Sequence, residues 1–264
     1  MTPPAAALKP NALKSGADIR TQVSAEEWQV RTDLAAAYRL VAHYDWDDLI
    51  FTHISARVPG PDEHFLINPY GWMFHEITAS SLVKVDLEGN IVSPTDNIIN
   101  PAGFTIHSAI HAARHDVGCV IHLHTSDGIA VSAQADGLLP LSQTAMIALS
   151  MLSYHEYEGI ALNLDERERL VADLGMNNLM ILRQHGTLAC GKTVASAFLN
   201  IHLLERACQA QIKTLAGGTK LHPTPVGVPE LVKAQVRGSK IDVSGLAWGG
   251  LLRMLDAKDA SYKS

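Results

Sequence analysis

The segment Cys119-Val-Ile-His-Leu-His-Thr125 combines a nearly continuous apolar run with two histidines. Such runs are typical of a strand that is buried on both faces of a sheet. In a strand, His122 and His124 point to the same face, with their Cα atoms about 6.5 to 7 Å apart. This spacing suits two imidazoles that bind one metal ion. The alternative is a pair of core histidines whose ring nitrogens are satisfied by hydrogen bonds.

His185 is the best candidate for a third ligand. It follows a second short apolar run, predicted as a buried strand over 179–182, and precedes Gly186, which lets the chain turn sharply. Three imidazoles that leave a fourth position open are typical of catalytic zinc, because structural zinc is normally closed by four protein ligands. The expected cofactor is a divalent metal ion, with zinc preferred over manganese, iron or cobalt. Such an ion polarises a carbonyl or enolate oxygen, or activates water.

The other segments predict one α/β domain in which helices cover a mixed sheet. Ser24 and Glu27 have the spacing of a capping box at the start of a helix over 24–44. Pairs of apolar runs separated by turn residues predict two β-hairpins, at 49–68 and 82–93. Further helices are expected after a turn at 101–103, ending near 116, and at 126–133, 165–175, 193–215 and 244–255.

Three regions differ in pattern along the chain. Residues 1–22 are rich in proline, lack apolar periodicity and are expected to form a flexible arm. Residues 23–220 carry the predicted strands and most helices, and should form the α/β domain. Residues 221–264 are expected to form a C-terminal extension with a short helix.

Composition excludes several classes of protein. The 264 residues are 47% hydrophobic and 18% charged, which excludes disordered, collagen-like and coiled-coil chains. A net charge of −6 without blocks of like charge argues against a nucleic-acid or membrane surface. No run approaches the roughly 18 apolar residues of a membrane span, so a cytoplasmic protein is expected. Cys119, Cys190 and Cys208 are odd in number and far apart, and should be buried and reduced.

Several motifs in this order and spacing resemble the class II aldolase/adducin family, over roughly residues 25 to 220. The matching segments are Asn68-Pro-Tyr-Gly71, Thr78-Ala-Ser-Ser-Leu-Val-Lys84, His107, Arg114-His-Asp-Val117, His122-Leu-His124-Thr and Arg183-Gln-His185-Gly186. The resemblance implies a three-layer αβα sandwich with a central mixed, mostly antiparallel sheet. It also implies a divalent metal held by His122, His124 and His185, and a ring-shaped homotetramer with active sites at the subunit junctions.

The sequence departs from this pattern where the family's sugar-phosphate aldolases bind phosphate and hold their acid/base. In those enzymes the segment before His107 reads Pro-Ser-Ser-Glu, with two phosphate-binding serines and a catalytic glutamate, whereas here the corresponding residues are Asn100-Pro-Ala-Gly103. Pro101 and Ala102 replace the two serines, and Gly103 replaces the glutamate. The family's Gly-Asn-x-Ser phosphate motif reads Thr52-His-Ile-Ser55. Gly103 followed by Phe resembles the head domain of adducin instead. The long basic tail of adducin has no counterpart after Leu215.

Three residues are the candidates for catalysis. His53 and His107 lie at the family's pocket positions, and an imidazole near neutral pKa suits acid/base chemistry; the alternative is that both fill space or bind backbone carbonyls. The Tyr70 hydroxyl is a candidate to donate a proton or bind a carboxylate, and otherwise Tyr70 is a rim aromatic. Secondary candidates are His111 to orient His107, and Gln143 for specificity or, alternatively, as a helix N-terminus. Lys84, Arg57 and Arg183 are candidates to neutralise an anionic substrate, and the alternative is that they are solvated surface residues.

The functional expectation is a metal-dependent lyase of aldolase or decarboxylase type. Because the phosphate motifs are altered, we expect a small carboxylate, such as an oxo or hydroxy acid, in place of a sugar phosphate. The alternative is a non-catalytic, adducin-like module for metal binding or protein interaction. The expected partners are a small-molecule substrate and further copies of the chain in a tetramer, with no nucleic acid and no membrane.

Overall fold

The computed structural model describes residues 19–159, 165–218, 220–239 and 241–264. Its centre is a seven-stranded sheet in the order β3-β2-β1-β4-β7-β6-β5. Among the described strands β5 and β6 pair in parallel and every other neighbouring pair is antiparallel. The strands are β1 His53–Arg57, β2 Phe65–Ile67, β3 Val83–Val85, β4 Cys119–Leu123, β5 Leu152–His155, β6 Leu179–Leu182 and β7 Gly186–Gly191.

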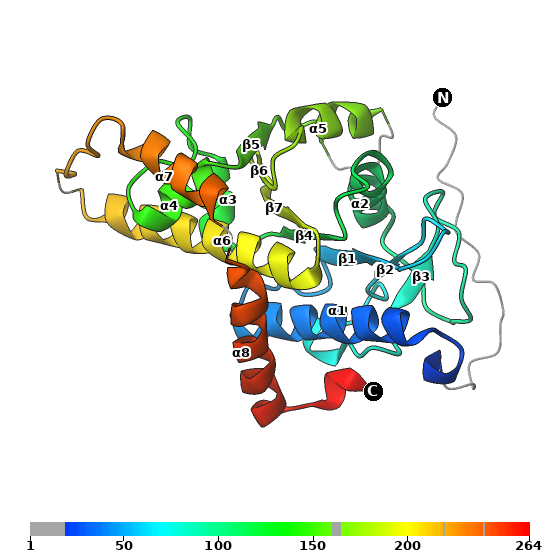
Figure 1. Cartoon of the computed structure of the whole chain (residues 1–264). Coiled ribbons are helices and arrows are strands. Elements are labelled where there is room, and N and C mark those ends of the chain that lie inside the picture. The colour runs from blue at the N-terminus through cyan, green and yellow to red at the C-terminus, as the bar shows by residue number, and fades with distance from the viewer. Residues whose placement is uncertain (1–18, 160–164, 219, 240) are drawn as a thin grey trace.

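Helices cover both faces of this sheet, which gives three layers (Figure 1). On one face lie α1 Ala25–His43 and α6 Val194–Ala216, with α8 Val243–Lys258 packed against both. On the other face lie α2 Pro101–Ala113 and α5 Glu166–Leu174. The shorter helices are α3 Ser126–Ser132, α4 Gln143–Leu149 and α7 Val228–Gly238, and one-turn 3-10 helices span Ile19–Thr21, Phe74–Glu76 and Ser261–Lys263.

The side chains of β4 alternate between two hydrophobic cores. Cys119, Ile121 and Leu123 join the larger core with α1 and α6, whereas Val120 joins the smaller core under α2 and α5. A strand with both faces covered must be apolar on both, which explains the continuous apolar run. His122 shares the face of Val120, so the alternation places its ring on the α2 side of the sheet.

The αβα sandwich with its mixed, mostly antiparallel sheet is confirmed. The expected helices correspond to α1, α2, α3, α5, α6 and α8, and the first hairpin to β1 and β2. Cys119, Cys190 and Cys208 are buried and free of disulfides, as expected. None of the described helices has the length and apolar character to cross a membrane.

Other elements differ from the expectation. In place of the second hairpin, the structure has strand β3 and one isolated bridge between Val85 and Ile91. The carboxylate of Asp86 accepts hydrogen bonds from the backbone N–H groups of Glu88 and Asn90, which tightens the turn in place of a longer ladder. Helix α7 and strands β5 and β7 were not predicted. Helix α4 begins at Gln143, which agrees with the alternative interpretation of this residue as a helix N-terminus.

The terminal regions have different outcomes. Most of the expected arm, residues 1–18, lies outside the described residues, and Ile19–Thr21 forms a 3-10 helix. The C-terminal extension packs into the larger core through Trp248, Leu255 and Tyr262. Its last residues also accept backbone hydrogen bonds from Ala79 and Ser80, so part of the extension is continuous with the α/β body.

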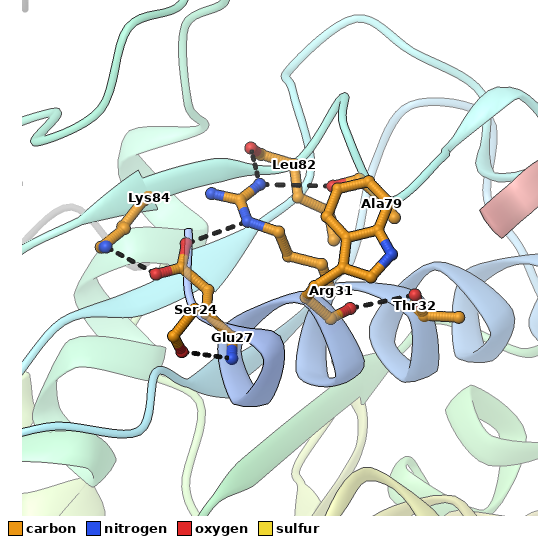
Figure 2. Close-up of polar contacts among 8 residues, drawn as sticks. Ser24, Glu27, Arg31, Thr32, Ala79, Leu82 and Lys84 are labelled. Carbon is orange, nitrogen blue, oxygen red and sulfur yellow. Dashed lines mark hydrogen bonds and ion pairs between the residues drawn. The ribbon is translucent and has the colours of Figure 1, made fainter. Parts of the chain in front are cut away.

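A buried arginine joins α1 to the segment before β3 (Figure 2). The Ser24 side chain accepts from the Glu27 N–H as expected, but the Glu27 carboxylate does not close a capping box. It binds Arg31 at 3.0 Å and Lys84 at 2.7 Å. Fully buried Arg31 also donates to the carbonyls of Ala79 and Leu82, at 3.2 and 3.0 Å. Burial lowers the pKa of Arg31, which makes these partners necessary.

We expect Arg31→Ala to lower the free energy of unfolding by about 3 to 5 kcal/mol, because it leaves two carbonyls buried without this donor and leaves Glu27 with Lys84 as its only ion-pair partner in the described structure. Urea denaturation measures this loss. Gln29→Ala is the matched control on the same helix, since it removes only an exposed hydrogen bond to Asp33 and should change stability by about 0.5 kcal/mol or less. Equal effects of the two substitutions would show that the Arg31 contacts add nothing.

Candidate metal centre and active site

Three histidines from neighbouring strands meet at one end of the sheet. His122 lies within β4, His124 follows its last residue, and His185 lies in the turn between β6 and β7. One ring nitrogen of each lies within 4.8 Å of the others. The Nε2 atoms of His122 and His124 are 3.0 Å apart. The structure thus brings together the three histidines that the sequence predicted as ligands.

Hydrogen bonds fix which ring nitrogens carry lone pairs. Nδ1–H of His122 donates to the Thr187 carbonyl at 3.0 Å, and Nδ1–H of His124 donates to the Asp48 carboxylate at 3.2 Å. Both partners only accept, and burial lowers the pKa of both imidazoles, so both rings are neutral with bare Nε2 atoms. Two lone pairs that face each other at 3.0 Å repel unless a cation lies between them. This donor set therefore fits a divalent ion such as zinc.

Backbone strain lies directly beside two of the histidines. Thr52, which precedes His53, has φ +65°, and Gln184, which precedes His185, has φ +50°. Non-glycine residues rarely adopt this left-handed conformation, and a β-branched threonine does so least readily. Thr52 Oγ1 is also buried without a hydrogen-bond partner among the described residues. Strain of this kind collects at functional sites.

The ring of His53 lies directly over Gly103. His53 begins β1, opposite His122 in the β1–β4 ladder, and Gly103 lies in the first turn of α2. A Cβ atom at position 103 would lie 2.2 Å from Cδ2 and 2.5 Å from Nε2 of His53. Real Cβ atoms essentially never show such contacts, so a side chain at position 103 would force the imidazole out of its present position. The two departures from the aldolase pattern are therefore coupled.

A chain of hydrogen bonds leads from His53 into the protein. Its Nδ1 contacts Nε2 of His107 at 3.0 Å, and Nδ1 of His107 contacts the Ser55 hydroxyl at 2.6 Å. The same hydroxyl contacts Nε2 of His111 at 2.8 Å. Burial lowers the pKa of all three imidazoles, that of His111 to about 3, so the rings are neutral. His107 and His111 thus lie behind His53 and orient it.

The three clustered histidines and His53 face a cavity of about 300 Å³. His53, His122, His124 and His185 line it, together with apolar side chains that include Phe51. None of the described residues that line it is Lys or Arg.

The remaining candidates lie elsewhere. Half-buried Tyr70, in the turn after β2, is not among the residues that line the cavity, and Gln143 faces a separate groove beside α7. The three cationic candidates have other partners. Lys84 binds Glu27, Arg57 binds backbone carbonyls, and Arg183 donates to the Gln134 carbonyl.

Sequence reasoning missed two acidic residues near the site. Asp48 was assigned only to a turn, although it binds His124 from 76 positions away. Glu205 is buried in α6 between the hydroxyls of Thr125 and Thr187. The sequence pattern that could have identified Glu205 is its position as a carboxylate on the apolar helix face formed by Ile201, Leu204 and Cys208.

Comparison with known proteins places this site in a family. The family model described as "Class II Aldolase and Adducin N-terminal domain" matches residues 32–212, more than half of the chain. The chain belongs to this family. The expected resemblance is therefore confirmed.

The similar proteins include one that is named as an aldolase and one that is an adducin. A Caulobacter vibrioides protein named "Putative aldolase class 2 protein" is 57% identical over 92% of this chain and 95% of its own length. Alpha-adducin of Rattus norvegicus is 47% identical over 71% of this chain, but the match spans only 26% of adducin.

Two solved structures share the fold. An aldolase II superfamily protein from Pseudomonas syringae is 53% identical, with a TM-score of 0.90 over 94% of this chain and all of its own. L-fuculose 1-phosphate aldolase from Glaciozyma antarctica is 25% identical, with a TM-score of 0.78 over 95% of this chain and 96% of its own.

The contact between His53 and Gly103 predicts a sign reversal in stability. Alanine in place of glycine normally stabilises a helix by about 0.5 to 1 kcal/mol. We expect Gly103→Ala instead to destabilise the protein by about 1 to 3 kcal/mol, because the new methyl group collides with the imidazole. In a His53→Ala background the same substitution should regain its ordinary stabilising sign. Thermal unfolding of the four proteins measures this coupling, and a stabilising Gly103→Ala in the parent chain would contradict the contact.

Proposed function

We propose that the chain is a metal-dependent lyase of aldolase or decarboxylase type that acts on a small oxo or hydroxy acid and not on a sugar phosphate. The observation that carries this proposal is the His53 ring over Gly103, since it puts an imidazole where the family's sugar-phosphate aldolases have their glutamate. The three-histidine cluster supports metal dependence, which is a property of class II aldolases.

In this proposal His122, His124 and His185 hold the metal ion, with zinc preferred over manganese, iron or cobalt. When bound, such an ion acts as a Lewis acid toward a carbonyl or carboxylate oxygen of the substrate. His53 accepts or returns the proton of the reacting group, because it lines the same cavity. Burial lowers the pKa of His53, so the imidazole is neutral and ready to accept a proton, but it is a weaker base than the near-neutral imidazole expected from the sequence. His107, hydrogen bonded to Nδ1 of His53, keeps the ring in place.

The cavity also supports the choice of substrate class. Its volume of about 300 Å³ suits a small molecule, and the described lining supplies no Lys or Arg for a phosphate dianion. The phosphate-binding serines of the family correspond to Pro101 and Ala102 here. The proposal retains the expected homo-oligomer, in which the exposed apolar side chains of Phe51, Ile129 and Tyr157 at the cavity would be covered.

The second candidate function is an adducin-like binding module without catalysis. The 47% identity to alpha-adducin favours it, as does the resemblance of Gly103-Phe104 to the head domain of adducin. The two candidates differ in turnover. Conversion of a small acid by the purified protein supports the lyase, whereas a metal-loaded protein that converts no oxo or hydroxy acid supports the binding module.

The metal assignment predicts that His124→Ala loses most of its bound zinc. Removal of one of three ligands should weaken metal binding by orders of magnitude. Elemental analysis of dialysed protein measures the zinc content. His75→Ala is the matched control, because His75 is exposed and remote from the cluster in the sequence, and it should keep its zinc. Full zinc content in His124→Ala would overturn the assignment.

The substrate assignment predicts no cleavage of ketose 1-phosphates at ordinary enzymatic rates. A positioned acid/base contributes roughly a hundred- to ten-thousand-fold, and each lost charge-assisted hydrogen bond to phosphate costs about 1.5 to 3 kcal/mol. The assay follows retro-aldol products with zinc-loaded protein, beside a panel of oxo and hydroxy acids. If the parent protein converts one of these acids, the His53→Ala variant should fail to convert it, although this variant keeps its zinc. Rapid ketose 1-phosphate cleavage that His124→Ala abolishes would refute the substrate class.

A further inference from the structure

Behind the three histidines, α6 carries a carboxylate that binds both neighbouring chain segments. Glu205 is 2% exposed, and its two oxygens each accept from a different threonine: Oε2 from the hydroxyl of Thr125 and Oε1 from that of Thr187. The threonines belong to segments 62 positions apart in sequence, since one follows β4 and the other lies near the start of β7. One side chain thus holds both segments.

Each threonine is directly connected to a histidine of the cluster. Thr125 is the residue after His124, and its hydroxyl also accepts from the Gly128 N–H as the N-cap of α3. Thr187 accepts Nδ1–H of His122 with its backbone carbonyl. The last pair of the β4–β7 ladder joins Thr187 to Leu123. His124 therefore lies just beyond the ladder, where the carboxylate of Glu205 provides the next link between the two segments.

Packing alone does not account for a glutamate at this position. Desolvation raises the pKa of Glu205 to about 7, so burying this group opposes its ionised form. An apolar side chain of similar size would avoid that cost and would suit the apolar face of α6. What it would not provide is an acceptor for two threonine hydroxyls at once.

We propose that Glu205 is a positioning residue of the metal centre, which fixes the segment after β4 relative to the start of β7 and so sets the convergence of the histidines. The inference rests on the proposed metal site and goes beyond it, because it assigns a role to a residue that touches no ligand ring. Outer partners of metal ligands typically alter metal affinity by about ten- to a hundred-fold when they are removed.

The test compares zinc affinity in Glu205→Leu and Glu205→Gln with that of the parent chain, by competition with a chromophoric chelator. Glu205→Leu keeps the volume but accepts neither hydroxyl, so zinc should bind about ten- to a hundred-fold more weakly. Glu205→Gln should lie between the two, because its amide accepts from one threonine only. The visible spectrum of the cobalt-substituted proteins should shift in the same order, since it reports ligand geometry independently of activity.

Gln211→Leu is the matched control on the same helix. Gln211 is also buried and accepts from the Leu139 N–H, but it contacts neither threonine in the described structure. This variant should lower the unfolding temperature and leave zinc affinity and the cobalt spectrum unchanged. An equal loss of zinc affinity in Gln211→Leu and Glu205→Leu would show that any destabilisation of α6 weakens zinc binding, and it would overturn the proposal.

The remaining outcomes separate this inference from the proposed function. If the parent chain binds no zinc, both the proposed metal centre and the proposed role of Glu205 are refuted. A parent chain that binds zinc, with Glu205→Leu of equal affinity, rejects the role of Glu205 alone. If Glu205→Leu does not fold, Thr187→Val removes one hydroxyl but keeps the carbonyl that binds His122, and unchanged zinc affinity in this variant overturns the proposal equally.

Discussion

The close approach of β7 to the end of β4 is the constraint on which the rest of the site depends. A Cβ atom at Gly186 would lie 2.3 Å from the Leu123 carbonyl oxygen and 3.2 Å from the ring of His124. Glycine is the residue that permits this contact. The contact sets the turn that carries His185 beside His122 and His124, and it continues the ladder that ends at Leu123 and Thr187. A wider separation of these strands would leave three isolated histidines.

The site is polar, and the acidic side chain bound to its histidines in the described structure is Asp48. The histidines are neutral because burial lowers their pKa values, and the carboxylate of Glu205 behind them is also kept from easy ionisation by burial. In such surroundings the charge of a bound cation is screened little, which makes its attraction for a substrate oxygen strong. This arrangement differs from a site that relies on arginine or lysine to recognise an anion.

Sequence patterns predicted the parts of the structure that depend on local spacing. The two-residue spacing of His122 and His124 on a buried strand, and the glycine after His185, were sufficient to find the cluster. Contacts between distant segments left no such signal. The ring of His53 meets Gly103 only because α2 crosses the start of β1, and Glu205 reaches two threonines only because α6 packs under both segments. Strand β7 was missed for a related reason, since its pairing partners and not its composition make it a strand.

The contact between the His53 ring and Gly103 also determines how this site responds to substitution. A side chain at position 103 requires the imidazole to leave its place, where a hydrogen bond to His107 holds it. A single substitution at position 103 therefore disturbs the ring and its hydrogen-bonded partners as well as the first turn of α2. If a smaller residue replaces His53 first, this penalty is absent, so the order of the two substitutions decides the stability of the intermediate protein.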